Sequence, residues 1–186
     1  MFGLAWSVLA GGCYRGAARP LDPAAITRDP AWIAVTTVPA LRQHGAEDCG
    51  HTVAAMVLTA WGTPTTPDEV VRTIGGPATK ALPAGRLRTY LLARGLRVFL
   101  LEGALPDLEH ELRAGRPVVV GVRRTFGGKL YAHYQVVVGV DPGGRRLAVL
   151  DPADGLLEIP FDGFLAEWAP TRHLMLVAFA PTAEGT

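Results

Sequence analysis

A strong turn signal separates two apolar runs in the second half of the chain, and this feature constrains the fold most. The turn is Asp141-Pro142-Gly143-Gly144, with the strand-like run 130–140 before it and the run 145–150 after it. Two strands joined by so short a loop form an antiparallel hairpin, because parallel strands need a crossover of a dozen or more residues. The hairpin therefore argues against a doubly wound parallel sheet.

Helical patterns dominate the first half of the chain, and strand patterns the second. Over 50–61, apolar residues recur at positions 53, 56, 57 and 60, the spacing of one helix face. Further helices are predicted over 67–74, 84–94, 106–114 and 161–168, and strands over 31–38, 97–101, 117–122, 130–140, 145–150, 156–159 and 173–180. This order is typical of an α+β fold, with helices packed against an antiparallel sheet.

The composition is that of a single folded domain. The 186 residues are 49% hydrophobic and 19% charged, which excludes a disordered chain. The 18 basic and 17 acidic residues give a net charge of +1, so we expect no nucleic-acid partner. Two cysteines are too few for a disulfide framework. No apolar run reaches the roughly 18 residues that a membrane span needs.

The first thirteen residues are similar to a bacterial lipoprotein signal. An apolar stretch, 1–12, ends in small residues and is followed at once by Cys13, the residue that such signals lipidate. We therefore expect export to the periplasm or cell exterior, with a lipid at Cys13 as the only membrane attachment. The alternative is an ordinary apolar leader that contains a cysteine by chance. Residues 14–30 are predicted to be a linker, 31–181 the domain and 182–186 a tail.

Cys49 occupies a position in which a thiol becomes reactive. It lies at the predicted start of the helix over 50–61, with Asp48 as a candidate N-cap. The positive end of the helix dipole favours the nucleophilic thiolate there, and Gly50 is expected to leave room for a substrate backbone. The other interpretation of Cys49 is a small buried hydrophobic residue, which is what most free cysteines are.

A thiolate needs a base, and His133 stands out among the five histidines because it opens an otherwise very apolar strand. If the turn is centred near Pro142, the hairpin pairs His133 directly with Asp151. A carboxylate there holds the tautomer of the imidazole and stabilises the imidazolium. The other interpretation of Asp151 is a turn residue that ends its strand before Pro152.

Gln43, six residues before Cys49, completes an ordered set of amide, thiol, imidazole and acid. Its side-chain amide can donate a hydrogen bond to the oxyanion that forms when a thiolate attacks a carbonyl group. Each residue alone means little, but their order along the chain indicates acyl-transfer chemistry.

The pattern QHGAEDCG, followed by HYQVVVGVD and LDPADG, resembles the bacteriocin-leader (double-glycine) peptidases and their stand-alone relatives, which are papain-like cysteine peptidases. The resemblance covers about residues 38–180. It implies a papain-like fold and hydrolysis of a peptide or protein through a thioester, with cleavage after small residues such as Gly-Gly. It also implies that Cys49 is the nucleophile, His133 the general base and acid, Asp151 the orienting acid and Gln43 the oxyanion donor, with no cofactor.

The chain departs from the best-known members of that group, which are the amino-terminal domains of peptide-exporting transporters. It carries no transporter, and its glycine pairs at 75–76 and 127–128 lack the P-loop pattern of ATP-binding proteins. Together with the export-like leader, this predicts a stand-alone, monomeric lipoprotein peptidase outside the cytoplasm rather than a cytoplasmic enzyme that cuts leader peptides.

Three other functions stay open at this point. If an amine captured the thioester, the protein would be a transferase instead of a hydrolase. A catalytically weak peptide-binding module of the same fold would show ordinary thiol reactivity at Cys49. A metal site formed by His44, Cys49 and His51 fits no ligand spacing that we can justify.

Overall fold

The computed structural model describes residues 16–74 and 81–181, so the predicted signal with Cys13 and the predicted tail lie outside the described residues. The helices are α1 (Pro23–Arg28), α2 (Cys49–Ala60), α3 (Pro67–Ile74), α4 (Ala84–Ala93), α5 (Leu105–Arg113), α6 (Phe161–Trp168) and the short 3-10 helix η1 (Ala169–Thr171). The strands are β1 (Arg19–Pro20), β2 (Ile33–Ala34), β3 (Arg97–Glu102), β4 (Val118–Phe126), β5 (Lys129–Asp141), β6 (Arg146–Asp151), β7 (Gly155–Pro160) and β8 (Leu174–Phe179).

The strands form one antiparallel sheet in the order β1-β7-β6-β5-β4-β8-β3. The strands β4 to β7 follow one another as consecutive hairpins, whereas β8 returns from the end of the chain to lie between β4 and β3. The short strand β2 pairs with Gly139 and Val140 of β5, just beyond the residue that pairs with the first residue of β4. The antiparallel sheet with helices packed on it confirms the predicted α+β class.

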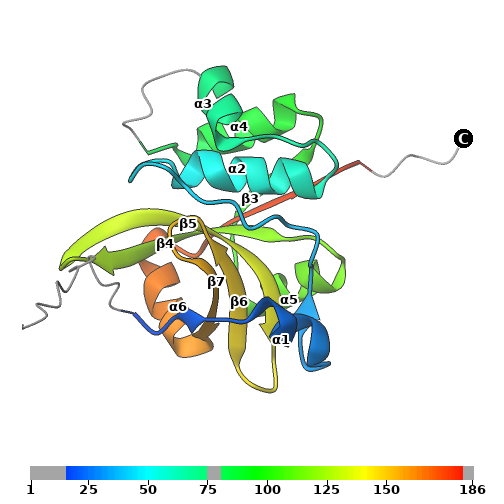
Figure 1. Cartoon of the computed structure of the whole chain (residues 1–186), viewed down its shortest axis with the longest axis vertical. Coiled ribbons are helices and arrows are strands. Elements are labelled where there is room, and N and C mark those ends of the chain that lie inside the picture. Colours follow the sequence, from blue (N-terminus) through cyan, green and yellow to red (C-terminus); the bar gives the residue numbers. More distant parts are fainter. Residues whose placement is uncertain (1–15, 75–80, 182–186) are drawn as a thin grey trace, which may run out of the picture.

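The helices form two groups around the sheet. In Figure 1, α2, α3 and α4 lie together on one side of the molecule, and α1, α5 and α6 lie with the strands on the other. Residues 49–58 of α2 are all buried, which is more than the single apolar face that the sequence predicted. The reason is that α2 packs on β5 with one side while α3 and α4 cover the other. None of the described helices is long and apolar enough to cross a bilayer.

The β5–β6 hairpin is present, but its register is not the predicted one. Val136 pairs with Leu150, and one extra residue of β5 shifts the pairing at Val138. The loop is also longer than the prediction assumed, since it contains the four residues 142–145. Extending the ladder by one residue places Gln135 beside Asp151, so His133 is not directly opposite Asp151. The two side chains lie on the same face of the sheet and meet diagonally.

The segment 14–30 is not the linker that the prolines suggested. In its described part, β1 pairs with β7, and α1 begins at Pro23 with Asp22 accepting a hydrogen bond from the N–H of Ala24. Ala18 and Ile26 are buried in the same core as the rest of the chain. Proline is well suited to the first position of a helix, so Pro23 marks the start of α1 rather than a flexible spacer.

The predicted strand over 31–38 is reduced to β2, and an irregular segment then leads to α2. Two backbone hydrogen bonds hold this segment on the sheet: Val35 N–H donates to the carbonyl of Val138 at 2.8 Å, and Gln43 N–H to the carbonyl of Pro152 at 2.9 Å. The second bond attaches the loop that carries Gln43 to the residue that follows Asp151.

Candidate active site

Cys49 is the first residue of α2, and its side chain is buried at the contact between the helical group and the sheet. Asp48 occupies the N-cap position, as predicted, but its carboxylate does not cap the helix. It instead accepts a hydrogen bond from the N–H of Gly45 at 2.8 Å. This bond closes a tight loop just before α2. The loop fixes the position of Cys49 at the start of the helix.

Gly50 does not leave room for a substrate backbone, contrary to the prediction. A Cβ atom at this position would lie 2.7 Å from the Cβ of Leu82 and 3.5 Å from a ring carbon of Tyr134. Glycine is needed here because Leu82 and Tyr134 pack directly on the first turn of α2. The consequence is a close approach between the start of α2 and β5, the strand that carries His133.

His133 is the predicted base, and the structure places it between Cys49 and Asp151. Its Nε2 lies 3.1 Å from Oδ2 of Asp151, which leaves the other ring nitrogen for the thiol of Cys49, with which the imidazole also interacts. Burial alone lowers the pKa of His133, but the hydrogen bonds and charges of Asp151 and Cys49 outweigh burial and raise this pKa to about 9. The imidazole therefore binds a proton readily at neutral pH.

Asp151 is fully buried and accepts hydrogen bonds on both carboxylate oxygens. Oδ2 is contacted by His133, by Nε2 of Gln135 at 2.8 Å and by Nη1 of Arg124, and Oδ1 accepts the backbone N–H groups of residues 153–154 at 2.7 and 3.0 Å. Burial raises the pKa of Asp151, but the contacts of His133, Arg124 and Gln135 outweigh burial and hold this pKa well below its usual range. The carboxylate stays ionised and fixed in orientation.

Arg124 and Gln135 are the site residues that the sequence analysis missed. Gln135 follows His133 on the same face of β5, and Arg124 reaches the same carboxylate from β4. Both are fully buried. Gln135 carried a signal in the sequence, because a polar side chain at an inward position of an apolar strand is the same observation that singled out His133. Arg124 carried none, because it lies beyond the end of the strand predicted over 117–122.

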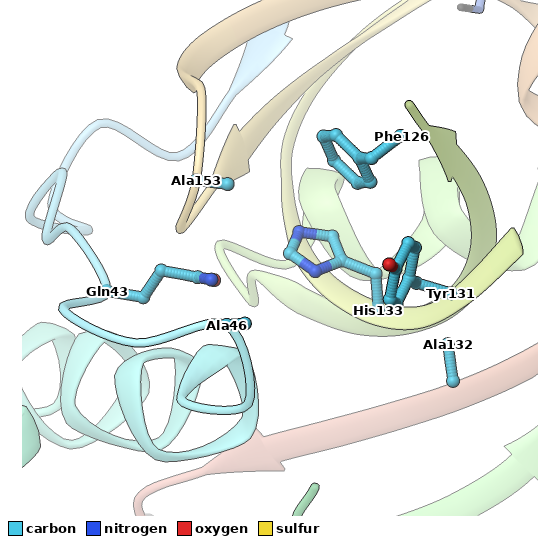
Figure 2. A pocket seen from close by; sticks show the side chains of 7 residues that line it. All are labelled: Gln43, Ala46, Phe126, Tyr131, Ala132, His133 and Ala153. Carbon is cyan, nitrogen blue, oxygen red and sulfur yellow. The ribbon is translucent and has the colours of Figure 1, made fainter. Parts of the chain in front are cut away.

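Gln43 and His133 both line a cavity of about 280 Å³. Figure 2 shows its side-chain amide pointing across this cavity toward the ring of His133. One N–H of the amide donates to the carbonyl of Gly45 at 2.9 Å, which leaves the second N–H as a donor. The other lining residues are Ala46, Phe126, Tyr131, Ala132 and Ala153.

The residues of the alternative metal site do not converge. His44 is exposed, and its Nδ1 lies 3.7 Å from a carboxylate oxygen of Asp68 on α3, whereas His51 is buried along α2. Within residues 16–74 and 81–181, no group of three or more His, Cys, Asp or Glu side chains is arranged to hold a metal ion.

A family model described as peptidase C39-like matches residues 35–175, a span that contains Gln43, Cys49, His133 and Asp151. The chain belongs to the peptidase C39-like family. This match confirms the resemblance drawn from the sequence motifs, and C39-like proteins are a family of cysteine peptidases. A comparison with curated protein sequences finds no match.

Solved structures show the same fold at low sequence identity. The peptidase domain of Streptococcus ComA, a bifunctional ABC transporter, is 18% identical with a TM-score of 0.64, over 76% of this chain and 97% of that one. A double-glycine-motif protease from an AMS/PCAT transporter, solved with its leader peptide, is 20% identical with a TM-score of 0.64, over 84% and 97%. A C39-like peptidase candidate from Bacillus anthracis is 15% identical with a TM-score of 0.63, over 81% and 98%.

Proposed function

We propose that the protein is a cysteine peptidase that hydrolyses a peptide bond through a thioester on Cys49. The observation that carries this proposal is the contact of the imidazole of His133 with the thiol of Cys49 on one side and with the ionised Asp151 on the other. A buried cysteine that only filled space would need neither neighbour. Membership of a peptidase family supports the same function.

In the proposed mechanism, His133 takes the proton of the Cys49 thiol, and the sulfur attacks the carbonyl carbon of the peptide. The oxyanion is stabilised by the backbone N–H of Cys49 and by the free N–H of the Gln43 amide. When the C–N bond breaks, His133 gives its proton to the leaving amine. Water then attacks the thioester, His133 accepts a proton from the water, and that proton returns to the sulfur as the acid is released.

The substrate that we propose is a peptide with small, uncharged residues next to the cut, such as Gly-Gly. The described residues that line the cavity include no aspartate, glutamate, lysine or arginine, and three of them are alanines. A cationic substrate side chain would therefore lose its hydration without gaining an anionic partner in this lining. The leader peptide bound to a protease of the same fold is consistent with a peptide substrate.

We also propose that the protein is exported and is held at a membrane by a lipid on Cys13.

The first experiment is the rate of Cys49 alkylation as a function of pH, in a chain that begins at Gly16 and so keeps β1 and α1 but lacks Cys13. We expect fast alkylation to persist at pH values where an ordinary thiol is protonated, and to be lost in His133→Ala. Alkylation that follows an ordinary thiol and is insensitive to His133→Ala would instead favour the binding-module alternative.

Peptide cleavage then tests the reaction itself. We expect Cys49→Ala to abolish the hydrolysis of every peptide that the unmodified protein cleaves. Product analysis with an added amine separates hydrolysis from transfer, because a transferase would convert a substantial share of the thioester into the new amide.

A further inference from the structure

Arg124 is the most deeply buried charged side chain near the candidate active site that the mechanism above does not use. It lies on β4, where Val122 pairs with His133 and Arg124 pairs with Tyr131, so Arg124 and His133 share one face of the sheet. Its side chain has no exposed surface. Its Nη1 contacts Oδ2 of Asp151, the same oxygen that receives Nε2 of His133.

Acidic residues from two other elements balance the charge of Arg124. Nη1 also lies 3.1 Å from Oδ2 of Asp154, in the turn between β6 and β7, and Nε lies 3.8 Å from Oε2 of Glu167 on α6. Arg124 thus connects the carboxylate beside His133 with the turn that follows this carboxylate and with α6.

Arg124 also contacts the wall of the cavity. Its guanidinium carbon lies 5.1 Å from the centre of the Phe126 ring, and that ring meets the imidazole of His133 edge-on at 6.2 Å between centroids. Figure 2 shows Phe126 beside His133 at the edge of the cavity. Arg124 therefore contacts both Asp151 and Phe126, two groups that lie against His133.

Stability alone does not explain this arrangement. Replacing a buried ion pair with apolar residues of similar volume is often neutral or stabilising, because desolvation of the charges offsets their attraction. A planar guanidinium can, however, hold several groups at fixed positions at once, and here Nη1 contacts both Asp151 and Asp154 while Nε faces Glu167. We infer that Arg124 is a positioning residue, which holds Asp151 and Phe126 so that the imidazole of His133 faces Cys49. The inference rests on the proposed function.

The test compares Arg124→Lys, Arg124→Met and the matched control Arg123→Met. Lysine keeps the charge but loses the planar fork, and methionine keeps the length but loses the charge. Arg123 is the neighbouring arginine on the opposite, exposed side of β4. For each variant we would measure thermal unfolding, the pH profile of Cys49 alkylation, and kcat and KM for a cleaved peptide.

For Arg124→Lys we expect a folded protein whose kcat is lower by at least about tenfold with little change in KM. The reason is that a small misplacement of a group in the site costs up to about 10²-fold. We also expect the low-pH alkylation of Cys49 to fall by a similar factor, and Arg123→Met to behave as the unmodified protein. A folded Arg124 variant with unchanged kcat and an unchanged alkylation profile would overturn the inference.

Two further outcomes are decisive. If neither Arg124 variant folds, Arg124 is a structural ion-pair residue and the inference is wrong. If the unmodified protein cleaves no peptide but its low-pH alkylation still depends on Arg124, the proposed peptidase function fails while the positioning role of Arg124 stands.

Discussion

His133 is a buried group whose protonated form the fold stabilises, and this has a consequence for stability as well as for chemistry. Its pKa in the folded protein is about 9, above the ordinary value of 6.5 that applies in the unfolded chain. The folded state therefore binds the proton more tightly. The resulting stabilisation is complete below about pH 6.5 and is lost as the pH rises through about 9.

We accordingly expect the free energy of unfolding to fall by up to about 3 kcal/mol between about pH 6 and about pH 10, at about 1.36 kcal/mol for each unit of pKa shift. Urea unfolding across this range measures the loss. His133→Gln should remove most of it. A pH dependence that is equally steep in His133→Gln would show that another group is responsible.

Gln43 gives a second prediction at the scale of a single residue. Gln43→Ala should lower kcat by about 10²–10³-fold, the usual cost of losing one oxyanion donor. It should leave the pH profile of Cys49 alkylation unchanged, because the pair of Cys49 and His133 stays in place. His44→Ala, next to it and exposed, is the control. If Gln43→Ala also removed the low-pH alkylation, Gln43 would act through the shape of its loop instead.

At the scale of elements, the position of α2 depends on the absence of a side chain at Gly50. We expect Gly50→Ala to destabilise the protein by about 1–3 kcal/mol, as an overpacked core site does, because the new Cβ would meet Leu82 at 2.7 Å. Gly85→Ala in α4 is the matched control, since nothing lies within 4 Å of a Cβ there.

Urea unfolding and peptide cleavage would be measured for both glycine variants. We expect Gly85→Ala to be neutral or slightly stabilising and to keep full activity, whereas Gly50→Ala should also lower kcat, because α2 and Cys49 must shift away from β5. Equal stability of the two variants would contradict the packing described for Leu82.

The elements themselves could be predicted from the sequence much better than their pairing. Local periodicity and turn residues placed α2 to α6 within a few residues, since both act over a single turn or strand. The extra residue at Val138 has no such local signature, so the direct pairing of His133 with Asp151 was wrong although the contact between them is real. The order of chemically active residues located the candidate site, whereas the contact of Arg124 depends on how β4 and β5 pair.

At the scale of the whole molecule, the segment before Ala31 belongs to the sheet and the core. A chain that begins at Ala31 should be less stable than one that begins at Gly16 by at least about 2 kcal/mol, because burial of a side chain such as Ile26 alone contributes about 1.5–3 kcal/mol. The shorter chain also leaves the edge of β7 uncovered. Urea unfolding of the two truncated proteins measures this difference, and equal midpoints with equal slopes would show that β1 and α1 contribute nothing.

The run of consecutive hairpins from β4 to β7 has a consequence for the order in which the protein folds. Contacts between neighbouring strands close short loops and form early, whereas the docking of α2 on β5 joins distant parts of the chain and forms later. His133 and Asp151 both lie on the early part, and Cys49 on the late part. We therefore expect the base and the acid to come together before α2 docks beside them, so in refolding the enhanced alkylation of Cys49 should appear no earlier than the hairpin contacts.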